Sequence, residues 1–258
     1  MIVEINEDIL YPNLLYNSPI VYSENITLHP IRMENIIAFQ QYITSFTIRK
    51  NSVFPIKNII KMSYLDFLFY CTQHLELGME YKIPYLQLLY RFAGLLLIMV
   101  CKNQEVSIGS DDAFFRINGE IIDAEKFDDL RRIILIQNDV DFNIDEFLNH
   151  DTEEALKKAQ DFENKKKKEK SSIEDYIDSV IVGLKVTEEY VQNLTIRKFW
   201  RYIKRMSKHE EYQALRLAEC GGMVTFKEPI QHWMTTLEVE DKYSNLKTDE
   251  QELRSKIE

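Results

Sequence analysis

Glycine and proline are scarce in this chain, which has 7 glycines and 6 prolines among 258 residues. Sandwiches and barrels contain many tight turns, and tight turns depend on these two residue types. The scarcity therefore disfavours an all-β architecture and favours long helices. Apolar residues, in contrast, make up 45% of the chain and aromatic residues 12%, which is enough for a packed core and excludes a globally disordered protein.

Long apolar runs are also missing. The most apolar stretch, FAGLLLIMVC, covers residues 92–101, about half the length that a helix needs to cross a bilayer. We therefore expect a buried core helix here and no membrane association. The first residues, MIVEINEDILYP, carry acidic side chains where a signal peptide requires basic ones, so export is not indicated.

Cysteine is rare, and Cys71, Cys101 and Cys220 are widely spaced in apolar sequence. An odd number of cysteines without a Cys-x-x-Cys pair does not fit a disulfide framework or a structural zinc site. We expect all three to be reduced thiols that pack as small buried hydrophobic residues, as in a cytoplasmic protein. The histidines do not pair at metal-ligand spacing either; they are His29, His74, His150, His209 and His232.

Sequence signatures of catalysis and cofactor binding are absent. The chain contains no G-x-S-x-G, Walker A or G-x-G-x-x-G sequence. An alternating acidic run at residues 139–145 resembles the start of a calcium-binding loop, but Ile144 occupies the position that needs glycine and His150 the position that needs glutamate. We therefore expect no metal, no cofactor and no enzymatic activity.

One basic segment contrasts with the net charge of −10, which by itself disfavours nonspecific binding to nucleic acid. The sequence IRKFWRYIKRMSK at residues 196–208 places an apolar stripe around Trp200 on one helix face and basic residues on the others. It could be the recognition helix of a helix-turn-helix, whose phosphate contacts would be made by Arg197, Arg201, Lys204 and Arg205. An amphipathic bundle helix explains the same pattern, and we prefer it; DNA binding stays an alternative.

Helical spacing and capping residues locate the helices in the first half of the chain. Apolar residues recur at helical spacing over residues 33–46. A second helix is expected to begin after Ser63 and to end at Gly78, and a third follows Pro84 into the apolar run. Before residue 30 the sequence contains only short extended candidates.

A β-hairpin is predicted by Asn118-Gly119, which lies between two β-prone runs. We expect it to belong to a two- or three-stranded meander over residues 106–122, followed by a return to helix at residues 124–137. In the second half, Ser172, Thr187 and Thr195 are the expected N-caps of three successive helices that form a compact bundle.

The composition changes between Asp145 and Ser172, where few apolar residues occur and the charged stretch ends in four consecutive lysines. We interpret this segment as a solvated helix that frays into a linker. The fold class is therefore mainly α with a small β-meander or hairpin, built as an N-terminal helical domain and a C-terminal helical bundle. The expected divisions are residues 1–144 for the N-terminal domain, 145–172 for the charged helix and lysine-rich linker, 173–237 for the bundle with a terminal hairpin, and 238–258 for a charged tail.

The stretch ECGGMVTFKEPIQHWM at residues 219–234 is open to two interpretations, a reactive centre or a hairpin that closes the last helix. Gly221-Gly222 suits a helix end that needs positive φ. MVTFK is then expected to be a strand, Pro229 to turn the chain, and Trp233 to return against the bundle. Cys220 has no histidine nearby in sequence to activate it, and a thiolate nucleophile needs such a base, so we prefer the structural interpretation.

Three segments of the second half resemble a family of tailed-bacteriophage proteins. They are DEFLNHDTEEALKKAQDFENKKKKEK, SIEDYIDSVIVGLKVTEEYVQNLTIRKFWRYIKRM and EYQALRLAECGGMVTFKEPIQHWM, within residues 145–234, and the N-terminal half fits the same layout more loosely. Members of the family are encoded among the tail genes and are described as tail or baseplate-hub assembly proteins, or tail assembly chaperones. The positions that match the pattern are Ile173, Asp175, Asp178, Leu194, Thr195, Phe199, Gly222, Val224, Phe226, Lys227, His232 and Trp233.

The resemblance implies a non-enzymatic assembly factor that binds another tail protein, such as the tape-measure protein or a baseplate-hub component, in the host cytoplasm. It leaves open a permanent structural subunit of the virion tail or baseplate, and it leaves open self-association. An assembly factor of this kind needs an apolar groove for amphipathic helices. The candidate partner contacts are Phe199, Trp200, Phe226 and Trp233, and the lysine-rich linker would let the two halves of the chain grip independently.

Overall fold

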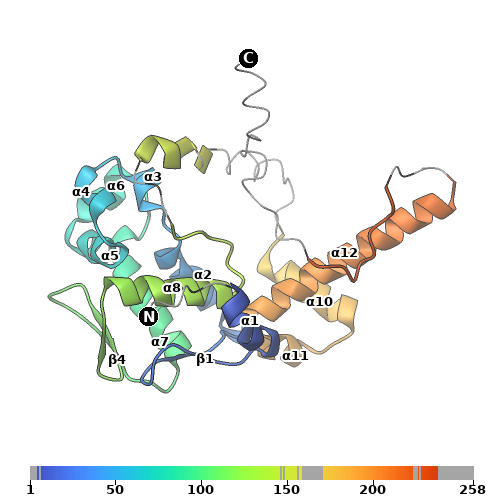
Figure 1. The fold of residues 1–258 in the computed structure, drawn as a ribbon, viewed down its shortest axis with the longest axis horizontal. Coiled ribbons are helices and arrows are strands. Elements are labelled where there is room, and N and C mark those ends of the chain that lie inside the picture. The colour runs from blue at the N-terminus through green and yellow to red at the C-terminus, as the bar shows by residue number, and fades with distance from the viewer. Residues whose placement is uncertain are drawn as a thin grey trace, which may run out of the picture. The chain divides into compact units, whose positions relative to one another are not determined.

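Helices dominate the computed structural model, and the mainly α class with small β elements expected from the sequence is confirmed (Figure 1). The structure describes residues 5, 7–145, 147, 149–155, 157–158, 171–222, 226 and 228–237. Within them the strands form a two-stranded and a three-stranded antiparallel sheet. The lysine-rich part of the expected linker and the expected charged tail at residues 238–258 lie outside the described residues.

The backbone contacts group the chain into two units. The first comprises residues 1–158 and 170–202, and the second comprises residues 159–169 and 203–258, so the long helix α12 (Ile196–Cys220) contributes to both. The domain boundaries expected from the sequence separate segments that fold independently, whereas these two units are defined by backbone contacts alone. The units therefore do not test the expected boundaries, which stay a prediction.

The first unit begins with helix α1 (Glu7–Tyr16), where only extended segments were expected. That expectation is wrong for these residues. Pro12, which normally argues against a helix interior, lies inside α1. The helix is held instead by burial of Leu10 and Leu14 on its inner face.

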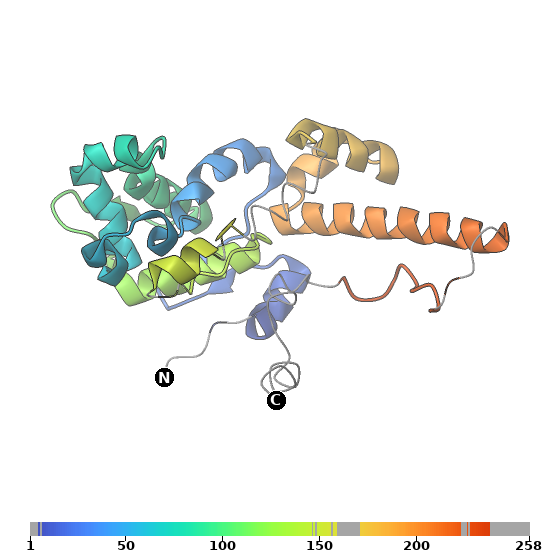
Figure 2. The same ribbon diagram turned by 90° about the horizontal axis from the view of Figure 1, so that it is seen from above.

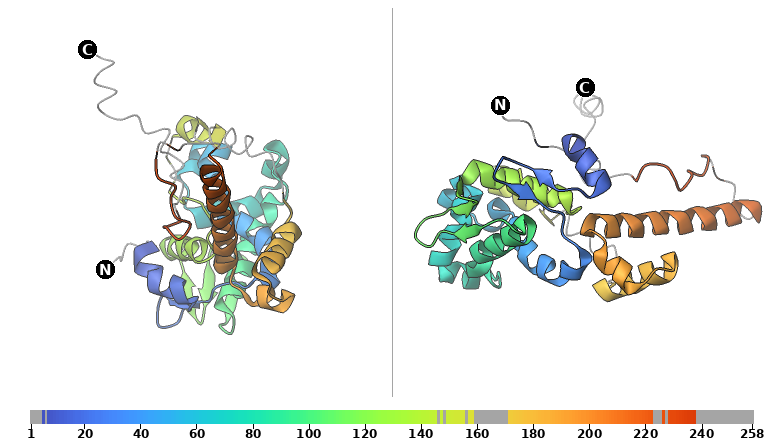
Figure 3. Two further views of the ribbon diagram at one scale, coloured as in Figure 1. Left: turned by 90° about the vertical axis from the view of Figure 1, so that its right-hand side faces the viewer. Right: turned by 90° about the horizontal axis from the view of Figure 1, so that it is seen from below.

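Strands β1 (Ile20–Val21) and β2 (Thr27–Leu28) form the extended segments that were expected, and they pair antiparallel. The hairpin lies along helix α8 (Ala124–Gln137), as the right-hand view of Figure 3 shows. Tyr22 Oη donates to Asp129 Oδ2 at 2.9 Å, and Gln137 Nε2 donates to the Leu28 carbonyl at 3.2 Å. The start of the chain is thereby fixed to a helix more than a hundred residues later.

Residues 33–46 are helical as predicted. They form η1 (Met33–Asn35), α2 (Ile36–Tyr42) and η2 (Ile43–Phe46). The two short helices that follow are α3 (Lys50–Val53) and α4 (Lys57–Lys61).

Helix α5 (Tyr64–Gln73) begins where expected, because Ser63 Oγ accepts a hydrogen bond from the Asp66 amide at 3.0 Å. Its expected end at Gly78 is wrong, since α5 stops earlier and Gly78 lies inside the next helix, α6 (Leu75–Glu80). A Cβ at Gly78 would lie 3.3 Å from the Ile83 carbonyl oxygen. Glycine here permits a close approach of the chain, a role that its position in the sequence did not reveal.

Helix α7 (Leu89–Cys101), preceded by η3 (Leu86–Leu88), is the central core helix that the sequence predicted. Its completely buried side chains include Leu96, Leu97 and Val100. Nearby, Phe127 of α8 packs its ring against Phe46 and Phe115, at centroid distances of 5.4 and 5.5 Å. No helix in the described part of the chain combines the length and the hydropathy of a membrane span.

The predicted meander is confirmed as three antiparallel strands, β3 (Val106–Ile108), β4 (Phe115–Ile117) and β5 (Glu120–Ile122). Asn118 and Gly119 join β4 to β5 with φ angles of 47° and 82°. Positive φ at both central residues defines the turn that Asn-Gly favours.

The charged segment after residue 145 is only partly as expected. Residues 150–155 are helical, but Glu153 is fully buried rather than solvated. Its carboxylate accepts hydrogen bonds from Arg49 Nη1 at 2.8 Å and from the Phe147 amide at 2.7 Å. A buried ion pair therefore ties this segment to the region of α3.

Helices α10 (Ile173–Leu184), α11 (Glu188–Asn193) and the start of α12 follow one another closely, and Figure 2 shows α12 as one continuous helix. All three predicted N-caps are confirmed. Ser172 forms a reciprocal capping box with Asp175, Thr187 Oγ1 accepts from the Tyr190 amide at 3.2 Å, and Thr195 Oγ1 accepts from the Lys198 amide at 3.3 Å.

The second unit contains the remainder of α12 and the segment that returns along it. The φ of Gly222 is +67°, which confirms the expected helix end. Arg205 Nη1 donates to the carbonyl oxygens of Trp233 and Thr235, and the Trp233 ring lies 4.8 Å from that of His209. Trp233 thus returns against α12, which is one helix of the expected bundle. The strand expected at residues 223–227 lies, except for Phe226, outside the described residues.

The three cysteines do not share one environment. Cys71 and Cys101 are buried, and burial raises the pKa of each thiol to about 12. Cys220 is exposed at the end of α12, so the expectation that all three are buried is wrong for this residue. Leu217, an apolar residue one turn earlier on the same helix, is also exposed.

We expect a thiol reagent such as Ellman's reagent to modify one cysteine of the native protein and three after denaturation. At pH 8 roughly one in 10,000 thiols with a pKa of about 12 is ionised, and burial also blocks access. Cys220→Ser should abolish the fast reaction, and Cys71→Ser should leave it unchanged. A fast phase that survives in Cys220→Ser would contradict the assignment.

Candidate functional site

Two segments that are far apart in the sequence are joined by their backbones at the start of α12. Ile196 N donates to the Ile31 carbonyl at 2.9 Å, and Met33 N donates to the Leu194 carbonyl at 2.8 Å. Between these bonds, Arg32 and Thr195 form an antiparallel bridge. The segment after β2 and the turn between α11 and α12 therefore hold each other in a fixed register.

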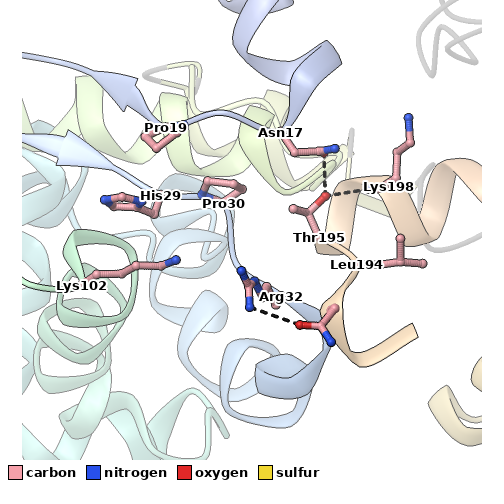
Figure 4. A pocket seen from close by; sticks show the side chains of 10 residues that line it. Asn17, Pro19, His29, Pro30, Arg32, Lys102, Leu194, Thr195 and Lys198 are labelled. Carbon is pink, nitrogen blue, oxygen red and sulfur yellow. Dashed lines mark hydrogen bonds between the residues drawn. The ribbon is translucent and has the colours of Figure 1, made fainter. Parts of the chain in front are cut away.

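Side chains extend this junction to the end of α1 (Figure 4). Thr195 Oγ1 donates to Asn17 Oδ1 at 2.8 Å, while Arg32 Nη1 donates to Asn193 Oδ1 at 3.2 Å. The φ of Asn17 is 53°, a conformation that asparagine tolerates better than most residues. Three separate parts of the first unit thus meet around one point.

A cleft of about 340 Å³ opens at this junction. Four of its lining residues are basic, namely His29, Arg32, Lys102 and Lys198. None of the lining residues in the described chain is Asp or Glu, although acidic residues outnumber lysine and arginine 42 to 32 in the whole sequence. The remaining lining residues are Asn17, Pro19, Pro30, Asn193, Leu194 and Thr195.

His29 and Lys102 face each other across one side of the cleft. His29 N donates to the Val100 carbonyl at 2.8 Å, which fixes the end of β2 to the end of α7. Burial, followed by the positive charge of Lys102, lowers the pKa of His29 below its usual value. His29 is therefore a neutral imidazole near pH 7 and can act as either donor or acceptor.

Lys102 has a strained backbone, with φ 46° and ψ −105° at the residue that follows α7. A non-glycine residue with positive φ outside the usual left-handed region costs about 1–3 kcal/mol. Gln104 Nε2 stabilises this end of the helix by donating to the Cys101 carbonyl at 2.8 Å. Lys102 is thus held at the cleft at an energetic cost.

A second, smaller groove lies between α1 and the first turns of α12. Its α1 side is apolar, and its α12 side is cationic. The lining residues are Tyr11, Leu14, Leu15, Asn17, Arg197, Lys198 and Arg201. Since Asn17 and Lys198 also line the basic cleft, the two depressions adjoin each other.

The four residues expected to contact a partner are not all brought together. Phe199 is completely buried, and Trp200 is half-buried against Tyr176, at a centroid distance of 5.1 Å. Both belong to the first unit, whereas Phe226 and Trp233 are half-buried in the second. Phe199 contributes to the core, and the role of the set as partner contacts stays a prediction.

The four expected phosphate contacts on α12 also differ in environment. Arg197 is buried, with 6% of its surface exposed, and Arg201 is half-buried in the groove beside α1. Arg205 is bonded to the returning segment of the second unit, and Lys204 is exposed. Their role in binding nucleic acid stays a prediction.

Sequence reasoning missed His29, Arg32 and Lys102 as site residues. They occur singly in unrelated segments and belong to no motif. Lys198 was noticed only as one of several basic residues on α12. The cleft exists because long-range backbone pairing brings these segments together, and no local pattern signals such pairing.

One part of the chain is similar to a phage-associated domain. Residues 164–238 match the family model described as the YomV second domain, a phage-derived family from the Bacillus phage SPBc2 region. The match includes α10, α11 and α12, and hence the Leu194–Lys198 side of the basic cleft. No curated protein and no solved structure matches the chain.

Proposed function

We propose that the protein is a non-enzymatic phage assembly factor that binds another tail protein, such as the tape-measure protein or a baseplate-hub component, during morphogenesis. The phage-associated domain at residues 164–238 supports the phage context. The observation that carries the binding role is the exposed apolar surface of α1. Four large apolar side chains of this helix are between 46% and 78% exposed, namely Ile9, Tyr11, Leu15 and Tyr16.

This exposed apolar surface is large for a helix of only ten residues, and Tyr11 and Leu15, one turn apart, line the same groove. Large apolar side chains that lie together on the surface indicate a binding site more often than scattered ones do. A helix of this length is marginal in water by itself, so contact with a partner would stabilise α1 as well as bury these side chains. Both effects favour binding.

The groove beside α1 indicates the chemistry of the partner. Tyr11 and Leu15 supply its apolar wall, and Lys198 and Arg201 supply positive charge on the opposite wall. An amphipathic helix with one apolar face and neighbouring acidic residues would complement both walls. We therefore expect the bound tail protein to present such a helix.

We expect the double variant Tyr11→Asp with Leu15→Asp to lose at least about tenfold in affinity for the tail protein. Two apolar side chains that the partner would bury become negative charges, and these charges face the partner's acidic residues. The matched control is Tyr85→Asp with Leu75→Asp, since both residues are exposed apolar positions elsewhere in the same unit. Proteins encoded beside the gene should be co-expressed with each variant, and affinity should be measured by titration of the purified pair.

Failure to recover a complex with any neighbouring tail protein would remove the proposal. An equal loss of affinity in the test and control variants would show that the binding surface is not on α1. Mass spectrometry of purified virions separates a transient factor, which is absent from the particle, from a permanent structural subunit, which is retained.

A further inference from the structure

We propose that the basic cleft at the start of α12 is a binding site for the phosphate group of a small molecule, either inorganic phosphate or a nucleotide. This inference is independent of the proposed assembly role. It depends on residues of the first unit only.

The first observation is the charge of the cleft. His29, Arg32, Lys102 and Lys198 line it together, and no carboxylate in the described chain lies within ion-pair distance of the last three. Elsewhere in the described residues, Arg49, Lys126, Arg132, Lys158 and Arg216 each pair with a carboxylate. Like charges that gather without a counter-charge repel one another, and a bound dianion would remove that cost.

The second observation is the strain at Lys102. Its backbone has φ 46° and ψ −105°, a conformation that the surrounding structure must impose. Figure 4 shows the lysine side chain reaching from the end of α7 toward His29 and Arg32. In the free protein the backbone strain and the approach of Lys102 to the charge of Arg32 are both unfavourable. This is the arrangement expected where a bound anion supplies the opposite charge.

The third observation is the size and extent of the positive surface. A cleft of about 340 Å³ suits a small molecule. Nucleic acid needs a positive track along several phosphates. Beyond Lys198, however, Arg197 is buried and Arg201 faces the apolar wall of the α1 groove. The basic surface therefore favours one phosphate group over a polymer.

His29 provides a reporter of occupancy. In the free protein its pKa is lowered by burial and by Lys102, and the charged groups that line the cleft with it are Lys102, Arg32 and Lys198. A phosphate dianion bound among them would favour the protonated imidazole and raise the pKa of His29. NMR titration of the full chain with and without phosphate measures this change directly.

The variant that tests the site is Lys102→Gly. Glycine adopts positive φ without strain, so this change removes the ammonium group and is expected to preserve or improve stability. Lys82→Gly is the matched control, because Lys82 also has positive φ, 53°, but does not line the cleft.

The full chain should be titrated calorimetrically, at constant ionic strength, with inorganic phosphate, with ADP and with a thymidine oligonucleotide. We expect binding of phosphate or ADP that weakens at least tenfold in Lys102→Gly and is unchanged in Lys82→Gly. Tighter binding of ADP than of phosphate would identify a nucleotide as the source of the phosphate group. No binding of either at 10 mM, equal binding by Lys102→Gly, or preferential binding of the oligonucleotide would overturn the proposal.

Discussion

Replacing Arg131 with alanine is expected to lower the free energy of unfolding by about 2–5 kcal/mol. The Arg131 side chain is 2% exposed, although it carries a positive charge. Its Nε donates to the Phe46 carbonyl at 2.7 Å, and its guanidinium lies 3.5 Å from the centroid of the Tyr64 ring. Alanine would remove a desolvated cation–π contact, leave the Phe46 carbonyl without this donor and open a cavity.

The neighbouring Arg132 is the control for this prediction. Its side chain is 35% exposed and pairs with Asp145 at 3.0 Å on the surface. Exposed pairs of this kind contribute about 0–1 kcal/mol, so Arg132→Ala should change the free energy of unfolding little. Urea denaturation followed by circular dichroism measures both variants. Similar midpoints for Arg131→Ala and Arg132→Ala would show that burial of Arg131 is not important for stability.

The second large effect is expected at Glu153, where Glu153→Ala should also lower the free energy of unfolding by about 3–5 kcal/mol. The Glu153 side chain is fully buried, and its partner Arg49 is 11% exposed. Without the carboxylate, Arg49 keeps a charge that has little access to water, and the Phe147 amide loses its acceptor. Hydrogen exchange should show faster opening of residues 142–153.

Two further variants separate the buried pair from general effects of charge. Glu154, the next residue, pairs with Lys158 at 2.9 Å on the surface, so Glu154→Ala should leave the urea midpoint almost unchanged. Arg49→Met combined with Glu153→Gln removes both charges but keeps an acceptor for Phe147, and it should recover most of the lost stability. If the double variant is less stable than Glu153→Ala, the unpaired charge is not the cause of the loss.

Sequence patterns located the features of this fold that depend on neighbouring residues. The caps at Ser63, Ser172 and Thr187 were predictable because a side-chain oxygen bonds to an amide three residues later. The turn at Asn118-Gly119 was predictable because few residue pairs adopt positive φ at both positions. The core helix α7 was predictable because its apolar residues are contiguous.

Features that depend on distant contacts were not predictable. Arg131 and Glu153 have the local sequence of surface residues, and only the fold shows that they are enclosed. Cys220 has the local sequence of a buried residue and is exposed. The basic cleft brings His29 and Lys102 together with Lys198. It forms because Arg32 pairs with Thr195, and neither segment has a sequence pattern that predicts this pairing.

The backbone bonds of Ile31 and Met33 to the α11–α12 turn also bear on whether the matched part of the chain is self-contained. Residues 164–238 are the portion that matches a family model. In this protein that portion is not self-contained, because the amide of Ile196 and the carbonyl of Leu194 form hydrogen bonds with residues of the N-terminal segment. If residues 164–238 were placed in another protein, that protein would therefore have to supply an extended segment that pairs with the α11–α12 turn in the same register.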